Sequence, residues 1–209
     1  PKSAPLPVQT ALSLGPVTVH FGQKNGKYPD GNQVVVRGSD AVALFDTPLA
    51  SVQREDLLHQ ADLVILGHVH EDHTCALHRM PDIPVFAPQA DLAALQSLEG
   101  LFAHYGYSPQ TRAAMEPEVL EHFHFQPRPD AQGYVDGRVW NLGGVRVRAL
   151  HYPGHTAGHS VLLVEPQGIA FIGDIDLSSF GPYYGDATSN LRQFQQSLAA
   201  LPTLPAKVW

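Results

Sequence analysis

The feature that most constrains the fold is the run ADLVILG at residues 61–67, which is apolar without interruption. A strand with one face in solvent alternates apolar and polar residues, whereas a short continuous apolar run is typical of a strand buried on both faces. A sheet that contains such a strand must be covered on each side by another layer. The run therefore predicts a layered α/β protein.

Strand-like and helix-like segments alternate along the rest of the chain. Strands are predicted at residues 17–21, 33–37, 41–45, 85–88, 145–152, 160–165 and 169–174, and residues 206–209 read as the start of another. Helices are predicted at residues 51–60, 89–106 and 191–201, and loops with a short helix that line or cover a pocket at 107–137. We expect one domain over residues 1–209, with two mixed sheets packed face to face, helices outside them and an irregular segment at 1–16.

Composition narrows the range of functions. The formal net charge is −7 and the four lysines and nine arginines form no basic run, which disfavours nucleic acid as a partner. No apolar run is long enough to predict a membrane span, and the opening segment is too rich in proline for a signal peptide. The single cysteine, Cys75, excludes an internal disulfide and favours a cytoplasmic location.

Three of the twelve histidines fall within six residues, directly after the buried strand. The segment reads His68-x-His70-x-Asp72-His73. In extended chain, residues two apart point the same way, so His68, His70 and Asp72 can converge while His73 is turned to a second position. Imidazole and carboxylate are ligands that zinc and similar cations prefer, and the pattern therefore predicts a metal site.

Two later segments supply further polar groups at strand ends. In HYPGHTAGHS (151–160) a Pro-Gly turn presents His155, and in FIGDIDLSS (171–179) Asp174 follows a glycine at the end of an apolar strand. A carboxylate at such a position is suited to bridge two cations, with one oxygen on each.

These blocks, in this order and approximate spacing, resemble those of the metallo-β-lactamase superfamily over nearly the whole chain. The Gly-His-Thr-x-Gly-His form looks closest to its glyoxalase-II-like and lactonase-like branch. The resemblance implies a four-layer αβ/βα sandwich with a dinuclear metal site at one edge of the sheets. It also implies two zinc ions per chain, although iron and manganese suit the same ligands.

Carried over residue by residue, the resemblance assigns His68, His70 and His155 to the first metal and Asp72 and His73 to the second, with Asp174 bridging them. Asp46 matches the strand-end aspartate that supports the ligand loop from behind, by fixing the orientation of a ligand. His159 is expected to support or pack against the site and not to bind metal.

The sequence departs from the superfamily in two places. Thr74-Cys75-Ala76 follows the first motif where a glycine pair is common, which predicts a bulkier loop. A further histidine, expected on a strand after the last helix, is not found before Trp209. We therefore expect a weaker second metal, and a natural chain that continues past Trp209 to supply this ligand.

The expected reaction is hydrolysis of a small ester, thioester or lactone by metal-bound hydroxide, with Asp72 as the catalytic proton carrier. Tyr183 and Tyr184 are candidate substrate contacts, since a phenol there can donate to an oxyanion. Phosphodiester hydrolysis, as in a nuclease, and iron-dependent persulfide dioxygenation stay as rival activities, and a metal-binding domain without catalysis is less favoured. The partner is expected to be a small molecule, and the chain a monomer or a homo-oligomer.

Overall fold

A computed structural model describes residues 10–23, 26–175 and 182–209. Its strands, in chain order, are β1 (Ala11–Leu14), β2 (Val17–His20), β3 (Gln33–Arg37), β4 (Val42–Phe45), β5 (Leu63–Ile65), β6 (Val85–Pro88), β7 (Gln132–Tyr134), β8 (Val139–Asn141), β9 (Arg146–His151), β10 (Ser160–Glu165) and β11 (Ile169–Phe171). Its α-helices are α1 (Glu55–Leu58), α2 (Leu92–Gln96), α3 (Leu98–Tyr105), α4 (Pro109–Pro117) and α5 (Leu191–Ala200). Short helical turns are η2 (Leu49–Ser51), η3 (Glu71–His73), η4 (Leu77–Arg79), the π-helical η5 (Glu118–His122) and η6 (Leu201–Thr203).

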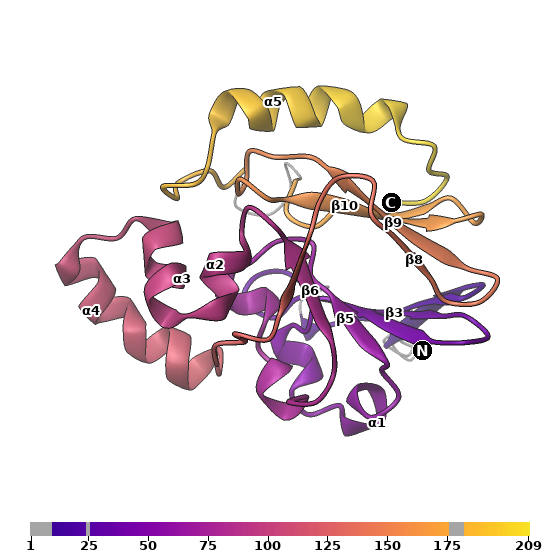
Figure 1. Cartoon of the computed structure of the whole chain (residues 1–209), viewed down its shortest axis with the longest axis horizontal. Helices are drawn as coiled ribbons and strands as arrows, with labels where there is room; N and C mark the ends of the chain where they lie inside the picture. Colours follow the sequence, from indigo (N-terminus) through magenta and orange to yellow (C-terminus); the bar gives the residue numbers. More distant parts are fainter. Residues whose placement is uncertain (1–9, 24–25, 176–181) are drawn as a thin grey trace, which may run out of the picture.

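The strands form two sheets. The larger sheet has the order β1-β2-β3-β4-β5-β6-β7, antiparallel from β1 to β4 and parallel from β4 to β7. The smaller sheet has the order β11-β10-β9-β8 and is antiparallel throughout. Figure 1 shows the smaller sheet stacked over β3, β5 and β6, with α5 above it and α1 below the larger sheet. The four-layer αβ/βα sandwich is confirmed.

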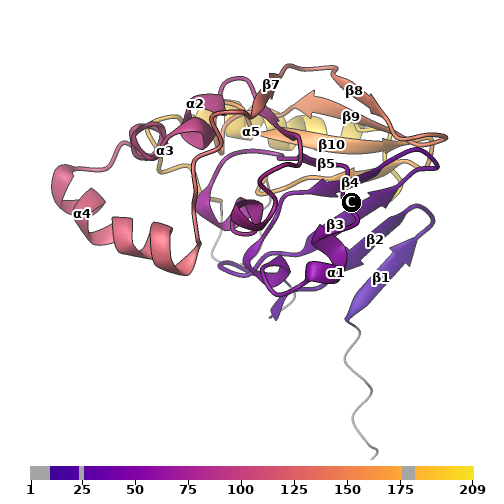
Figure 2. The same ribbon diagram turned by 60° about the horizontal axis from the view of Figure 1, so that its bottom comes forward.

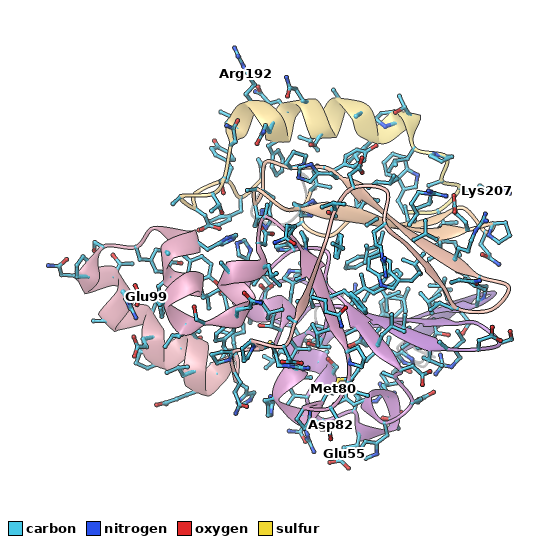
Figure 3. The ribbon with its side chains drawn as sticks, in the orientation of Figure 1. Glu55, Met80, Asp82, Glu99, Arg192 and Lys207 are labelled. Carbon is cyan, nitrogen blue, oxygen red and sulfur yellow. The ribbon has the colours of Figure 1, made fainter. Side chains whose placement is uncertain are left out.

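Three apolar clusters fill the three spaces between the four layers. Alternation along each strand assigns side chains to opposite faces, so Val34 and Val36 of β3 pack between the sheets and Val35 packs toward the helices. On the other sheet, Leu163 of β10 packs against Phe194 of α5. Arg192 lies on the opposite, outer face of α5 and points away from the sheet (Figure 3). Each sheet thus has another layer on both of its faces, and the run at 61–67 contains β5, whose residues are all buried, as predicted.

The structure differs from the sequence prediction in several elements. Residues 11–14, expected to be irregular, form β1 on the edge of the larger sheet, while residues 1–9 lie outside the described part of the chain. The helix expected over 89–106 is broken at Ser97, whose backbone is extended and whose hydroxyl accepts a hydrogen bond from Gly100 N to cap α3. The helix expected over 51–60 shortens to a 3-10 turn and α1.

Two strand predictions also need correction. The short strands β7 and β8 fall in or beside the segment where only loops and a helix were expected. The smaller sheet is antiparallel and not mixed, although Val208 near the chain end makes a parallel bridge to Ile169 at its edge. Among the described residues, no helix combines the length and apolar character needed to cross a bilayer.

Figure 2 shows that α3 and α4 form a lobe beside the sandwich, reaching away from both sheets. Helix α4 has no buried residue, and it is followed by η5, whose Val119 is buried in the core cluster on the helix side of the larger sheet. This lobe lies next to the edge of the sheets where the predicted ligands gather.

Candidate metal centre

The predicted ligands come from segments that leave one edge of the sandwich. Parallel strands β4 and β5 end at Phe45 and Ile65, so their carboxyl ends bring Asp46 and the 68–73 segment to the same edge. Asp46 accepts a hydrogen bond from Gly67 N at 2.9 Å, which holds the start of the ligand segment. Asp46 has a positive φ of 54°, a conformation that few residues other than glycine adopt. Such local strain is typical of functional sites.

Two glycines shape the other ligand segments. Gly154 has a φ of 130°, and a side chain there would collide with the backbone of Phe194 in α5. Gly173 has a φ of 58° and lies against the ring of His159. Both positions therefore require glycine, and the tight packing fixes His155 and Asp174, each the next residue along the chain.

Three imidazole nitrogens converge at one point. The Nε2 atom of His68 lies 3.2 Å from Nδ1 of His70 and 3.2 Å from Nε2 of His155, and the latter two atoms lie 3.1 Å apart. Four ligands placed tetrahedrally at a zinc–nitrogen distance of about 2.0–2.1 Å lie about 3.3–3.4 Å from one another. The distances between the three nitrogens therefore match those between three ligands of a tetrahedral zinc site, with the fourth ligand position open.

The protons on two of these rings are already committed elsewhere. His70 Nε2–H donates to Asp186 Oδ2 at 2.6 Å, and His155 Nδ1–H donates to the carbonyl of Tyr183 at 2.8 Å. Nδ1 of His70 and Nε2 of His155 then carry no proton. Their lone pairs point toward each other and toward His68. Burial lowers the pKa of all three imidazoles, that of His70 to about 3, so each ring is neutral and carries a single proton. Nδ1 of His68 has no hydrogen-bond partner among the described residues. A cation among these residues fits that donor set.

A second group of donors lies beside the first. His73 Nδ1–H donates to Asp46 Oδ2 at 2.7 Å, and the buried Nε2 of His73 has no hydrogen-bond partner among the described residues. That nitrogen lies 3.6 Å from Asp72 Oδ2 and 3.4 Å from Asp174 Oδ1. A lone pair facing two carboxylates is unfavourable unless a positive charge lies nearby. Donor atoms of His68, His73 and Asp174 lie within 4.8 Å of one another and could hold a cation, whereas Asp72 is not part of that group.

Asp174 lies between the two groups. Its Oδ1 faces His73, while its Oδ2 lies 3.8 Å from His155 Nε2. The side chain is 41% exposed, in contrast to the buried imidazoles of His68 and His155. The two oxygens of Asp174 thus face different groups of donors.

The pKa values of Asp72 and His73 in the metal-free chain are shifted by burial and by the charges of their neighbours. Burial raises the pKa of Asp72 to about 8. Burial lowers the pKa of His73, but the carboxylates of Asp72, Asp174 and Asp46 outweigh it and raise that pKa well above its ordinary value. A proton therefore occupies this position in the metal-free chain, where a bound cation would replace it.

His159 lies behind Asp174. Its Nδ1–H donates to the carbonyl of Tyr152 at 3.0 Å, and its Nε2 accepts from Asp174 N at 3.2 Å. Neither ring nitrogen is left for a cation. The ring thus occupies the supporting position expected from the sequence.

A cavity of about 410 Å³ opens beside the two groups. His70, Asp72, His155 and Asp174 are among its lining residues. The remaining lining residues are Tyr28, Glu71, Tyr105, Tyr107, Met115 and Tyr183. These described lining residues include neither lysine nor arginine.

The tyrosines of the cavity are ordered by acidic partners and by stacking. The hydroxyls of Tyr28 and Tyr105 both donate to the carboxylate of Glu71, that of Tyr28 at 3.3 Å. Tyr105 and Tyr107 stack with ring centroids 4.9 Å apart. The outer wall is therefore aromatic and carries one acceptor carboxylate.

The two candidate substrate tyrosines are placed differently. Tyr183 lines the cavity, and its hydroxyl donates to Asp186 Oδ1 at 3.0 Å. Tyr184 is exposed, is not among the lining residues and faces Phe194 of α5, with ring centroids 6.4 Å apart. Tyr183 therefore lies at the cavity and Tyr184 does not, because the side chains of these neighbours pack in different places.

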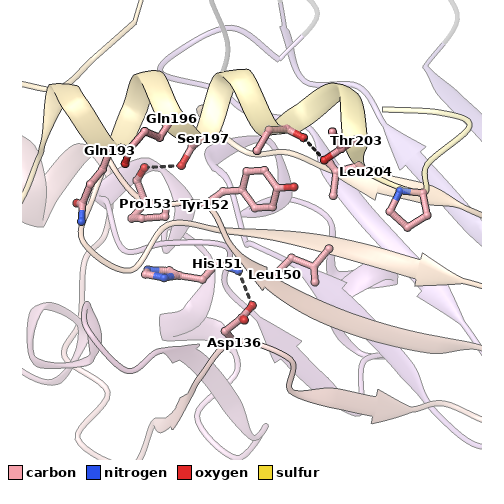
Figure 4. A pocket seen from close by; sticks show the side chains of 12 residues that line it. Asp136, Leu150, His151, Tyr152, Pro153, Gln193, Gln196, Ser197, Thr203 and Leu204 are labelled. Atoms are coloured by element: carbon pink, nitrogen blue, oxygen red, sulfur yellow. Dashed lines mark hydrogen bonds between the residues drawn. The ribbon is translucent and has the colours of Figure 1, made fainter.

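A second hollow, of about 510 Å³, lies between β9 and α5 (Figure 4). His151, Tyr152, Gln193 and Ser197 are among its lining residues, and Ser197 donates to the carbonyl of Pro153 at 2.7 Å. None of the predicted metal ligands lines it. It is separate from the candidate metal centre.

Sequence reasoning missed two buried aspartates at the centre. Asp91 follows β6 and accepts from Thr156 Oγ1 at 2.6 Å and from Gly158 N at 2.8 Å, so it anchors the segment that carries His155. Asp91 could have been predicted from its position just after a parallel strand, because ligand sites lie at the carboxyl ends of such strands. Asp186, the partner of His70, comes from an irregular segment, and no local pattern marks it.

No family model matches the chain. It is 29% identical to an atrochrysone carboxyl ACP thioesterase of Aspergillus fumigatus, over 97% of this chain and 57% of that protein. It is 25% identical to an acyl-coenzyme A thioesterase of Bos taurus, over 71% of this chain and 60% of that protein. The chain spans about half the length of the curated relatives it matches.

Among solved structures, the fold matches an archaeal metallo-β-lactamase superfamily protein of Sulfolobus tokodaii with a TM-score of 0.67 and 19% identity, over 93% of this chain and 78% of that one. The chain thus has the metallo-β-lactamase fold, and its structural neighbours are proteins of that superfamily. Its curated relatives include thioesterases and lactamase-like proteins.

Proposed function

We propose that the chain hydrolyses a thioester or a related activated ester of a small acyl group, with two divalent cations at the candidate metal centre. The observation that carries the proposal is the convergence of ring nitrogens from His68, His70 and His155 at 3.1–3.2 Å, beside a cavity large enough for a small substrate. The names of the relatives support the thioester.

His68, His70 and His155 would hold the first cation, and Asp72 and His73 the second, with Asp174 between them. Zinc is our choice of cation, and iron and manganese suit the same donors. Bound there, the cations would supply an activated water and a positive charge that stabilises the oxyanion.

The residues of the chain then have distinct tasks. In hydrolysis, water adds to the acyl carbon, the bond from that carbon to sulfur or oxygen breaks, and a proton from the water ends on the leaving group. Asp72 lies at the cavity and is the group we assign to carry that proton. Tyr183, Tyr105 and Tyr107 would hold the acyl group against the aromatic wall.

The cavity lining disfavours phosphodiesters as substrates. A phosphodiester carries a negative charge that proteins usually bind with arginine or lysine, and the described lining offers neither while Glu71 adds a carboxylate. A neutral acyl group with an aromatic or hydroxylated surface suits this wall better. Activity on small molecules, and not on nucleic acid, is therefore part of the proposal.

The test uses the purified chain, freed of metal and then loaded with zinc, iron or manganese in parallel. Each form is assayed with an aryl thioester, a lactone and a phosphodiester, and oxygen uptake is followed with a persulfide. We expect metal-dependent cleavage of the thioester or lactone that a chelator abolishes. Turnover of the phosphodiester alone, or oxygen uptake by the iron form alone, would contradict the proposal.

The cellular location, the domain organisation and the oligomeric state of the protein are further parts of the proposal. A cytoplasmic location is supported by the free, buried Cys75 as the single cysteine. A single-domain organisation over 1–209 is expected from the continuous sandwich. A homo-oligomer is as compatible with the described surface as a monomer.

A further inference from the structure

Asp186 connects the first predicted metal position with the wall of the cavity. Its side chain is buried, and its two oxygens have different partners. Oδ2 accepts the Nε2–H of His70 at 2.6 Å, and Oδ1 accepts the hydroxyl of Tyr183 at 3.0 Å. Both His70 and Tyr183 line the cavity.

The segment that carries Asp186 is itself fixed from two sides. Ala187 N donates to the carbonyl of Tyr105 at 3.0 Å, which ties the segment to the end of α3. Asp186 N donates to Ser189 Oγ at 3.2 Å, and that hydroxyl donates to the carbonyl of His155 at 2.6 Å. The position of Asp186 is therefore set by the same segments that hold the ligands and the cavity wall.

His70, His104 and Asp186 also lie close enough together to suggest a third cation position. The hydrogen bonds argue against that interpretation. Both oxygens of Asp186 already accept protons, and His70 cannot offer Nε2 to a cation while its Nε2–H donates to Asp186. The cluster is explained by hydrogen bonds alone.

We propose that Asp186 is a positioning residue: it fixes His70 in the Nε2–H form, so that Nδ1 is the ligating atom, and it links Tyr183 in the cavity wall to the first metal position. This inference rests on the proposed function. A carboxylate behind a ligating imidazole sets its tautomer and orientation and raises its basicity. Neither Asp186 nor its link to Tyr183 was expected from the sequence.

The first measurement is the affinity of the chain for zinc, by competition with a chromophoric chelator, for the unchanged chain and for Asp186→Asn. Asparagine keeps the size of the side chain and removes its charge. We expect about 10–100-fold weaker binding of the first zinc. The matched control is Asp46→Asn, which alters the carboxylate behind His73, and there the loss should fall on the second zinc.

The second measurement needs neither metal nor turnover. In nitrogen-15 spectra of histidine-labelled, metal-free chain, His70 should be protonated at Nε2, and Asp186→Ala should convert it to a mixture of tautomers. Tyr183→Phe keeps the contact between Asp186 and His70, so both the tautomer and the affinity for the first zinc should stay close to those of the unchanged chain.

The outcomes separate this inference from the proposed function. If the unchanged chain bound no metal, both would be wrong. If it bound zinc and Asp186→Asn bound the first zinc as tightly, or if Asp46→Asn weakened the first zinc equally, the role of Asp186 alone would be overturned. Should Asp186→Asn fail to fold by circular dichroism, an Nδ1-protonated His70 in the unchanged chain would still overturn it.

Discussion

Nδ1 of His73 lies 2.7 Å from Oδ2 of Asp46, so a buried carboxylate supports the imidazole on the side away from the cavity. The same carboxylate accepts from Gly67 N through its other oxygen. His73 therefore presents Nε2 toward Asp72 and Asp174 in a fixed orientation, although the described residues offer no fourth donor there.

This relationship predicts unequal binding of two cations. Zinc added to metal-free chain should bind in two steps, with the second step more than about tenfold weaker than the first, since the second group has Asp72, His73 and the shared Asp174 but no further imidazole. Isothermal titration with zinc measures both steps. Two equal steps would show that another residue completes the second group.

Removal of a predicted ligand should abolish turnover without unfolding the chain. His70→Ala deletes one of three nitrogens at the first position, and Asp72→Ala deletes a donor and the proposed proton carrier. We expect a loss of about a hundredfold or more in kcat/KM for each, because the charge that stabilises the oxyanion is lost. Far-ultraviolet circular dichroism should be unchanged, because both residues lie in an edge segment outside the sheets. A variant that kept near-native turnover would contradict the assignment.

Asp91 predicts a pH dependence of stability. Burial raises the pKa of Asp91 to about 6, above its value near 3.9 in an unfolded chain. Between these values the folded chain holds a proton that the unfolded chain has released. The stabilising contribution is therefore complete below about pH 4 and is lost as pH rises through about 6, a change of about 3 kcal/mol.

Asp91→Asn, which imitates the protonated carboxyl, should remove this dependence. Denaturant unfolding from pH 4 to 7, with chelator present throughout, gives the difference in free energy of unfolding between variant and unchanged chain. The free energy of unfolding of Asp91→Asn, relative to that of the unchanged chain, should increase as pH rises from 4 to 7. Asp136→Asn, at the protein surface, serves as the control, and parallel pH curves for Asp91→Asn and the unchanged chain would exclude this role.

Alanine substitutions of the neighbouring residues Tyr183 and Tyr184 should differ in their effect on substrate binding. Tyr183→Ala removes part of the cavity wall and a partner of Asp186, so KM for the acyl substrate should rise about tenfold, the loss of roughly one buried contact. Tyr184→Ala should leave kcat and KM within about twofold, as is usual for a residue away from the site. Steady-state kinetics on both variants measures this, and equal losses would mean that Tyr184 reaches the substrate after all.

The layers of the fold and the clustering of the predicted ligands could be predicted from the sequence because both follow from patterns among residues close together in the chain. The uninterrupted 61–67 run places a buried strand, and His68, His70 and Asp72 follow at alternating positions from its end. Strand β1 was missed because none of its four residues is buried, and a strand at a sheet edge requires little apolar content. Asp186 could not be found, since its contact with His70 joins residues 116 positions apart.

Ser97 interrupts what would otherwise be one helix, and the interruption turns α3 away from α2, so that α3 and α4 project beside the sandwich. Met115 on α4 reaches the cavity, while α4 itself buries no residue. Substitutions at the exposed positions of α4 should therefore cost little stability and leave the ligand segments untouched. Under the proposed function, substitutions in this part of the wall should alter the acyl preference without changing any of the proposed metal ligands.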